Sequence, residues 1–168
     1  MDENSLIKKA VTGDKKAFAK LYTLYKDRLY RYAYFKLGND SDAQDAVSAC
    51  ITAAYENIVG LKSEKAFQAW IFKILYRCCC ELVKNQIAEN SREALEELNK
   101  LPVSENGYIA AELKEALYQL CPDDREIVLL SAVAGYNSRE ISKITGLKSS
   151  TVRSRLSRGL AKMKEFLE

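Results

Sequence analysis

The sequence predicts an all-α protein with two small helical domains, joined by a flexible acidic linker. Three observations support this prediction. The chain of 168 residues holds only two prolines and seven glycines, which favours helices over strands and turns. Apolar residues recur at helical spacing near both ends of the chain. The stretch between them is acidic and polar, so we divide the chain into residues 1–87, a linker at 88–108, and residues 109–168.

The first domain is predicted to consist of helices from residue 5 to about residue 84. Apolar side chains follow one helical stripe through residues 17–33, and Gly38 ends that helix. The polar run at 39–42 provides a loop and an N-cap for the next helix, which covers residues 42–58.

A third helix follows a short basic and polar loop at residues 61–65. It is predicted from Ala66 to about Ile87, because large apolar residues fall on one of its sides at helical spacing. In the linker, a short helix is compatible with residues 91–98.

The second domain is predicted to end in a helix-turn-helix unit. Four helices are expected, at residues 109–120, 123–134, 138–144 and 149–167. Pro122 suits a first helical turn, and the acidic pair after it complements the helix dipole. Gly146 ends the third helix, and Ser149 and Ser150 can cap the fourth. In such a layout the last helix enters the major groove of DNA.

The residue types argue against a metal centre and against an enzyme. The five cysteines include three consecutive ones, and the chain holds no histidine. Neighbouring cysteines on a helix point in different directions and no C-x-x-C pair exists, so no zinc site is expected. Without a histidine base or a catalytic motif, we predict that the protein is not an enzyme and needs no cofactor. The cysteines are interpreted as small, partly buried thiols in a reducing compartment.

No segment of the sequence suggests membrane insertion or secretion. The apolar runs are far too short to span a bilayer, and the acidic-then-basic start of the chain is unlike a signal peptide. We therefore expect a cytoplasmic protein without membrane insertion.

Charge is distributed unevenly along the chain, although the formal net charge is only +3. Residues 1–84 hold 14 basic and 10 acidic side chains, residues 85–137 hold 4 and 10, and residues 138–168 hold 8 and 3. Two basic domains joined by an acidic stretch suggest that both domains bind nucleic acid.

The last helix has one apolar stripe and one small, polar face. At about 100° per residue, the stripe that packs inward contains Val152, Leu156, Gly159, Leu160, Met163 and Leu167. The opposite face carries Ser150, Ser154, Ser157 and Arg158, and the flanks carry Arg153 and Arg155. Such a face can lie close to base edges while its arginines reach bases or phosphates.

The alternative for this last helix is a solvated surface helix, but such a helix would usually alternate charge signs. Here Glu140 is the only acidic residue between Glu126 and Glu165.

Both ends of the chain resemble the extracytoplasmic-function (ECF) sigma factors of the sigma-70 family. The resemblance to their minus-35-reading domain rests on E-I-S-K-I-T-G-L, followed by T-V-R-S-R-L-S-R-G-L-A-K-M. The resemblance to their minus-10-melting domain rests on three successive segments, A-F-A-K-L-Y-T-L-Y-K-D-R-L-Y-R-Y-A, D-S-D-A-Q-D-A-V-S-A-C-I-T-A-A-Y-E-N-I and A-F-Q-A-W-I-F-K-I-L-Y-R-C-C-C-E-L-V-K. It covers nearly the whole chain apart from the linker, and the order of the two halves makes it specific.

The resemblance implies a protein that binds bacterial core RNA polymerase, at its clamp and flap, and directs it to a subset of promoters. Clamp binding would use Asp42, Gln44, Asp45, Ser48, Ala49 and Glu56. The melted minus-10 strand would be held by Lys62, Ser63, Lys65, Lys73, Tyr76 and Arg77. The minus-35 duplex would be contacted by Arg139, Lys143, Lys148, Ser150, Thr151, Arg153, Ser154, Arg155, Ser157 and Arg158.

A melted strand also needs aromatic surfaces on which unstacked bases can lie. The third helix supplies rings from Phe67, Trp70, Phe72 and Tyr76. Phe67 and Trp70 fall on its apolar side, where a position in the core is the plainer interpretation. Tyr76 and Lys73 point elsewhere and are the better candidates for DNA contact.

The chain departs from the family pattern at several positions. The family usually shows Gln-Glu where this chain has Ser48-Ala49, so clamp binding is expected to rest on other residues of that helix or to be weaker. Arg77 and Glu81 stand where an asparagine and an aspartate are usual, which affects minus-10 selectivity. No zinc-binding anti-sigma segment lies on this chain, so an anti-sigma factor acting on it would be a separate protein.

Two other functions remain open from the sequence. A stand-alone helix-turn-helix transcriptional regulator would share the last domain, but would usually employ the first domain to dimerise or to bind a ligand. A sigma-like protein that docks on polymerase without melting DNA is the other, and the departures at Ser48-Ala49 and Arg77 are its support.

Overall fold

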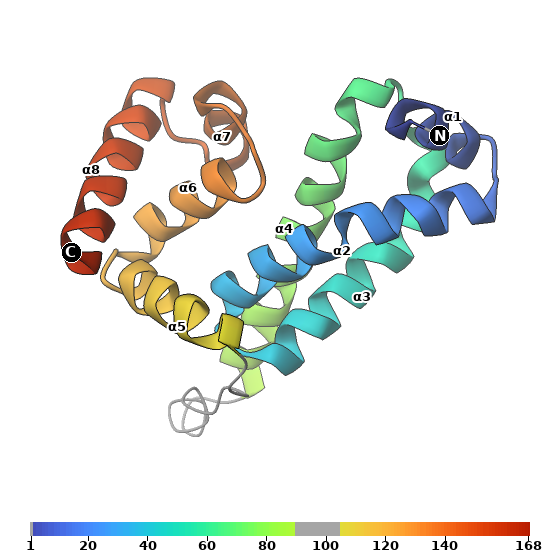
Figure 1. Cartoon of the computed structure of the whole chain (residues 1–168). Coiled ribbons are helices and arrows are strands. Elements are labelled where there is room, and N and C mark those ends of the chain that lie inside the picture. The colour runs from blue at the N-terminus through green and yellow to red at the C-terminus, as the bar shows by residue number, and fades with distance from the viewer. Residues whose placement is uncertain (1, 90–104) are drawn as a thin grey trace. The chain divides into compact units, whose positions relative to one another are not determined.

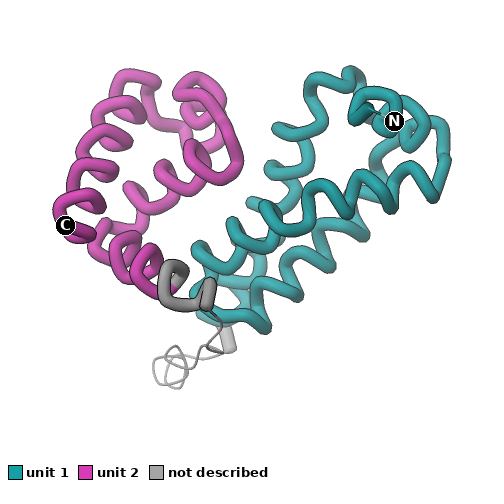
Figure 2. The backbone as a smooth tube through the Cα atoms, in the orientation of Figure 1, with its two compact units in different colours: residues 1–95 teal, residues 96–168 magenta. Residues whose placement is uncertain are grey.

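The computed structural model describes residues 2–89 and 105–168, with side chains for residues 2–87 and 111–168. Every regular element among these residues is helical, which confirms the all-α prediction. The chain divides into two compact units, residues 1–95 and residues 96–168 (Figure 2). The short helix considered at residues 91–98 lies outside the described residues.

The described part of unit 1 consists of four α-helices, which Figure 1 shows, and two short 3-10 turns. They are α1 (Glu3–Val11), α2 (Lys15–Leu37), α3 (Asp40–Asn57), η1 (Ile58–Gly60), η2 (Glu64–Ala66) and α4 (Phe67–Glu89). Helix α3 packs against both α2 and α4, and α1 lies against α2 and the two 3-10 turns. The loop predicted at residues 61–65 is thus partly helical and has α1 beside it.

Side-chain caps set where the helices of unit 1 begin. The Asp14 carboxylate accepts hydrogen bonds from two amides in the first turn of α2. This cap separates α1 from α2, a break between helices that was not predicted. Gly38 ends α2, as predicted. Asn39 caps α3 by accepting a hydrogen bond from the Asp42 amide at 2.8 Å, in line with the polar run at 39–42.

Large aromatic rings fill the core of unit 1. Tyr32, Phe67 and Phe72 are all but completely buried. The Phe72 ring meets the Tyr32 ring edge to face, with centroids 6.0 Å apart, and Phe67 meets Tyr25 in the same way at 5.1 Å. Aromatic side chains bury a large apolar area. These rings therefore fix α4 against α2, and with α4 the loop that precedes it.

Unit 2 contains the predicted helix-turn-helix. Its described helices are α5 (Glu105–Tyr118), α6 (Pro122–Ala132), α7 (Ser138–Thr145) and α8 (Ser149–Leu167). Pro122 occupies the first turn of α6 together with the acidic pair, as predicted. The capping prediction for the last helix is wrong, because Ser149 is already helical. The N-cap is Lys148, which has an extended backbone and makes no side-chain capping bond.

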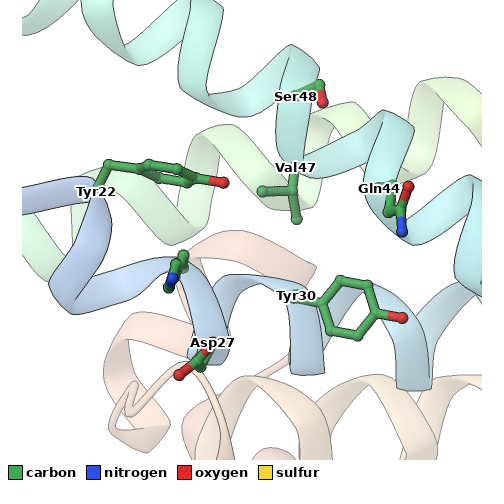
Figure 3. A pocket seen from close by; sticks show the side chains of 7 residues that line it. Tyr22, Asp27, Tyr30, Gln44, Val47 and Ser48 are labelled. Carbon is green, nitrogen blue, oxygen red and sulfur yellow. The ribbon is translucent and has the colours of Figure 1, made fainter. Parts of the chain in front are cut away.

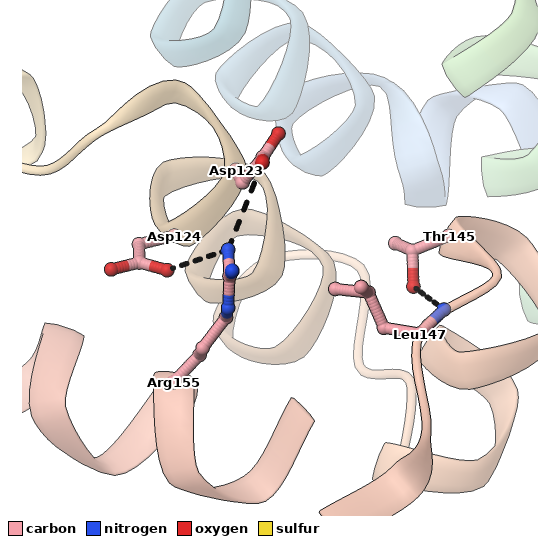
Figure 4. Close-up of polar contacts among 5 residues, drawn as sticks. All are labelled: Asp123, Asp124, Thr145, Leu147 and Arg155. Atoms are coloured by element: carbon pink, nitrogen blue, oxygen red, sulfur yellow. Dashed lines mark hydrogen bonds and ion pairs between the residues drawn. The ribbon is translucent and has the colours of Figure 1, made fainter. Parts of the chain in front are cut away.

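The turn between α7 and α8 is stabilised by a glycine and by side-chain hydrogen bonds. Gly146 has a φ of +79°, a left-handed conformation that favours glycine, and it ends α7 as predicted. The Leu147 amide donates to Thr145 Oγ1 at 3.3 Å (Figure 4). The Ser142 hydroxyl donates to the Leu147 carbonyl. These contacts fix the angle at which α8 leaves the turn.

Candidate nucleic-acid interface

Helix α8 exposes the small, polar face that the sequence predicts. Val152 and Gly159 are buried on its inner side. The side chains of the outer side are exposed, namely Ser150, Arg153, Ser154, Ser157 and Arg158. Thr151 is half-buried. A face of short hydroxyls between two arginines has the shape and charge to approach a duplex groove.

The inner stripe of α8 is narrower than predicted. Leu160 and Leu167 are 46% and 45% exposed, so the prediction that both pack inward is wrong. Both residues lie about 60–80° round the helix from Val152, at the rim of the stripe. Gly159 marks the closest packing, because a Cβ atom there would lie 3.2 Å from Val128 Cγ2 of α6. Glycine at this position therefore lets α8 lie directly on α6.

Arg155 differs from the other arginines of α8. Its guanidinium Nη1 lies 3.4 Å from an Asp124 carboxylate oxygen and 3.7 Å from one of Asp123 (Figure 4). Its side chain is 30% exposed, whereas Arg153 and Arg158 are exposed. The predicted DNA contact by Arg155 would have to compete with these two carboxylates of α6.

Helix α7 and the turn add three cations to this face. Arg139, Lys143 and Lys148 are exposed, as expected for residues that contact phosphates. Helix α7 begins with a reciprocal capping box, in which Asn137 and Glu140 each accept a hydrogen bond from the other's amide, at 2.9 and 2.8 Å. This box was not predicted, although the N-x-x-E pattern in the sequence indicates it.

In unit 1, the loop before α4 presents a second basic surface. Lys62, Ser63 and Lys65 are exposed. The Ser63 hydroxyl oxygen accepts a hydrogen bond from the Lys65 amide at 3.3 Å and so caps η2. Glu64 pairs with Lys8 of α1 at 3.8 Å. The loop is therefore ordered by its own cap and by a contact with α1.

Helix α4 continues this surface with Lys73 and Arg77, both exposed. Tyr76 is half-buried, and Lys36 Nζ lies 4.4 Å from the centre of its ring. The ring of Phe67 lies in the core, which confirms the plainer interpretation of its apolar-side position, and the ring of Phe72 is buried as well, so the prediction that Phe72 offers a surface for bases is wrong. Phe67 packs against Tyr25 and Phe72 against Tyr32, both tyrosines of α2. Trp70 is half-buried beside Phe67, with ring centroids 5.9 Å apart.

The candidate polymerase-binding residues of α3 separate into two groups. The exposed group contains Gln44, Asp45, Ser48, Ala49 and Glu56. Asp42 is half-buried and has internal partners, because its carboxylate accepts hydrogen bonds from Asn39 and from Gln86 of α4. It therefore joins the start of α3 to the end of α4.

A hollow of about 300 Å³ lies between α2 and α3, beside the exposed group (Figure 3). Tyr22, Lys26, Asp27 and Tyr30 line it from α2, and Gln44, Val47 and Ser48 from α3. The short Ser48 side chain is one of its lining residues. No local pattern in the sequence indicates this hollow, because it depends on how two helices are placed.

The cysteines are all free thiols. Cys50 is buried, and its Sγ donates to the Ile71 carbonyl at 3.6 Å. Burial raises the pKa of the Cys50 thiol well above its ordinary value. Among the described residues, no three His, Cys, Asp or Glu side chains come together as metal ligands. In the same residues, no helix is both long and apolar enough to cross a membrane.

Comparison with known proteins agrees with this arrangement. Residues 21–87 match the model of sigma-70 region 2, and residues 110–163 match that of sigma-70 region 4. The chain is 31% identical over 144 residues to the RNA polymerase sigma factor SigV of Bacillus subtilis, a match that covers 84% of this chain and 86% of SigV. It is 26% identical to the ECF RNA polymerase sigma factor SigE of Mycolicibacterium smegmatis, over 93% of this chain and 65% of SigE.

A solved structure shows the same fold. The sigma factor RpoE, in complex with the anti-sigma factor NepR from Bartonella quintana, superposes with a TM-score of 0.69. The match has 21% sequence identity and covers 90% of this chain and 97% of RpoE.

The fold and the two matched regions define an RNA polymerase sigma factor, of the class that binds core RNA polymerase and directs transcription initiation. Within that class, the chain belongs to the extracytoplasmic-function group of the sigma-70 family.

Proposed function

We propose that this chain directs core RNA polymerase to promoters whose minus-35 duplex is contacted by unit 2 and whose melted minus-10 strand is held by unit 1. The observation that carries the proposal is that sigma-70 regions 2 and 4 stand in order on one chain. Each of them exposes a basic surface on a helix whose other side is packed. A stand-alone regulator would not account for unit 1.

In unit 2, base reading falls to the outer face of α8. Ser154 and Ser157 are short enough to let the helix approach base edges, and Arg153 and Arg158 flank them. Phosphate contacts fall to the exposed cations of α7 and the turn, Arg139, Lys143 and Lys148. Ser150 and Thr151 lie in the first turn of α8, where amides without helical partners also favour phosphate.

In unit 1, the melted strand runs over the loop and α4. Lys62, Lys65, Lys73 and Arg77 supply a cationic track for phosphates, with Ser63 in the loop between them. Tyr76 offers the accessible part of its ring to an unstacked base. Because Phe67 and Phe72 are buried, stacking depends on fewer rings than the sequence suggests.

Polymerase binding falls to the exposed surface of α3. Asp45 and Glu56 supply negative charge. Gln44 and Ser48 line the α2–α3 hollow, and Ala49 is exposed next to Ser48. Asp42 contributes indirectly, by holding the start of α3 in place. Unit 2 would contact the polymerase flap, as the family resemblance implies.

The protein would act by binding alone, without catalysis, in the cytoplasm where polymerase and promoters are found. An anti-sigma factor, supplied as a separate protein, is a natural regulator, since RpoE forms such a complex with NepR.

Binding of the full chain to purified bacterial core RNA polymerase tests this proposal. Asp45→Arg should weaken binding at least ten-fold, because it reverses an exposed charge on α3. Glu112→Arg on α5 is the matched control, also an exposed carboxylate, and should bind like wild type. Wild-type chain that binds specific duplex DNA but no polymerase would identify a stand-alone regulator. Polymerase binding without promoter opening, detected by permanganate reactivity of unpaired thymines, would identify a docking protein.

A further inference from the structure

We propose that Arg155 is a positioning residue, which holds the DNA-reading helix α8 on α6, rather than a residue that contacts DNA. This inference rests on the proposed minus-35 function of unit 2. It concerns how the exposed outer face of α8 is held in position. It gives Arg155 a different role from Arg153 and Arg158, which are proposed to contact DNA.

The placement of Arg155 on α8 is the first argument. At about 100° per residue, Arg155 lies roughly 60° from the buried Val152. The exposed Arg153 lies about 100° from Val152 in the other direction, and Arg158 about 120° from it. Arg155 is therefore the arginine nearest to the packed side of the helix, and its 30% exposure agrees with this position.

The partners of Arg155 are the second argument. Asp123 and Asp124 are consecutive residues in the first turn of α6, where the helix dipole favours negative charge. Arg155 Nη1 approaches both carboxylates, at 3.7 and 3.4 Å (Figure 4). The Asp124 side chain is only 24% exposed, so this pair is partly shielded from solvent. Removal of the guanidinium would leave two adjacent carboxylates without this cation.

The neighbouring glycine contact is the third argument. Gly159 lies one turn along α8 from Arg155, and a Cβ atom there would lie 3.2 Å from Val128, one turn along α6 from Asp124. The apolar contact sets the distance between the two helices, but a flat glycine surface restrains rotation of α8 weakly. The ion pairs at the adjacent turn supply a directional restraint, and the rotation of α8 decides which side chains face the base edges.

A double-mutant cycle in the full chain tests the restraint without any DNA. Arg155→Gln should raise the unfolded-to-folded ratio of unit 2 about two- to five-fold. The same substitution should have no effect in the background Asp123→Asn/Asp124→Asn, because the partner charges are gone. Arg153→Gln is the matched control, an exposed arginine of the same helix, and should leave the ratio unchanged. Equal effects of Arg155→Gln in both backgrounds would overturn the proposal.

The second readout distinguishes positioning from DNA contact. The probe is a duplex enriched from a random-sequence pool by the wild-type chain bound to core polymerase. Loss of one phosphate contact reduces the slope of log affinity against log salt by about 0.9. Arg158→Gln should reduce this slope or abolish discrimination at one base pair. Arg155→Gln should leave the salt slope unchanged but lower the sequence specificity, measured as the affinity for the selected duplex divided by the affinity for a scrambled duplex. Arg155→Lys, which keeps the positive charge, should retain part of this specificity.

The outcomes separate this inference from the proposed function. A reduced salt slope in Arg155→Gln would show a phosphate contact and overturn the inference, while the minus-35 function would stand. Failure of the wild-type chain to enrich any duplex would remove the minus-35 function, and the unfolding cycle would then still decide whether Arg155 holds α8 on α6.

Discussion

Unit 1 and unit 2 both present a basic face, but they support it in different ways. In unit 1 the loop and α4 rest on a core of large rings, with Tyr32, Phe67 and Phe72 almost completely buried. In unit 2 the core beneath α8 is mostly aliphatic, and its largest fully buried side chains are Ile127, Leu129, Leu130 and Ile141. The remaining support for α8 is local: a glycine contact, a glycine turn and two ion pairs.

This difference predicts how each unit fails. Stability in unit 1 is spread over several rings that share one core, so a core substitution there should lower the stability of the whole unit. In unit 2 the position of α8 depends on a few contacts, each worth on the order of 1 kcal/mol. Substitutions there should change DNA reading more than they change stability.

Phe72→Ala should have the largest effect on stability. Phe72 is fully buried against Tyr32, and removal of a buried phenylalanine costs about 3–5 kcal/mol of unfolding free energy. Trp70 is the only tryptophan, so its fluorescence during urea unfolding reports unit 1 alone. Phe166→Ala in α8 is the matched control, since that ring is 44% exposed, and it should leave the Trp70 transition unchanged. A small effect of Phe72→Ala would contradict the ring-based core.

Gly159→Val should have the next largest effect, and it should act on unit 2. Its side chain would meet Val128 Cγ2 and Leu120 Cδ1, which a Cβ atom alone approaches to 3.2 and 3.6 Å. Overpacking of this kind costs about 1–3 kcal/mol. We expect faster hydrogen exchange in α8 and loss of promoter-specific transcription, with polymerase binding retained. Ala161→Val, at an exposed position of the same helix, controls for the β-branched residue in exchange measurements.

Gly146→Ala should cost about 1–2 kcal/mol in unit 2, through backbone strain alone. Its φ of +79° is unfavourable for alanine, although a Cβ atom would meet nothing within 4 Å. Gly60→Ala in unit 1 is the matched control, because it also has open space but no positive φ. Hydrogen exchange of the α7 and α8 amides measures the difference. Equal protection in both variants would mean that the turn does not set the position of α8.

Much of this molecule was predictable from local sequence signals. Gly38, Gly146 and Pro122 mark helix ends by their own conformational preferences, and the apolar stripes of α2, α4 and α8 follow from helical periodicity. The exposed serines and two of the α8 arginines also lie where the periodicity placed them. Signals of this kind act within a few residues of one another.

The features that escaped prediction depend on residues far apart in sequence. Periodicity places Arg155 on a flank of the apolar stripe, as it does Arg153, and only the position of α6 brings two carboxylates to it. From its position in α3, Asp42 is predicted to contact the polymerase clamp, but in the structure its carboxylate accepts a hydrogen bond from Gln86 of α4. Periodicity predicts that Leu160 and Leu167 pack inward, because it gives a direction but not the extent of the surface that a helix packs against.

Tyr136→Phe should have the smallest effect near neutral pH and should become visible only in alkali. Burial, with a smaller contribution from the Glu140 charge, raises the pKa of the Tyr136 hydroxyl above its ordinary value. The folded state thus holds this proton more tightly than the unfolded state. Its contribution to stability is complete below the unfolded pKa of about 10 and is lost as the pH rises above that value.

The two units provide the internal comparison for this measurement. Far-UV circular dichroism in urea reports both units, while Trp70 fluorescence reports only unit 1, where burial also raises the pKa of Tyr25. Above pH 10, Tyr136→Phe should reduce the pH dependence of the unfolding free energy of unit 2. The pH dependence of the unfolding free energy of unit 1, measured by Trp70 fluorescence, should remain as in wild type. If the pH dependence of the unfolding free energy of unit 2 were the same in Tyr136→Phe and wild type, Tyr136 would ionise as readily in the folded state as in the unfolded state. The small core under α7 and α8 would then admit water more readily than the aromatic core of unit 1.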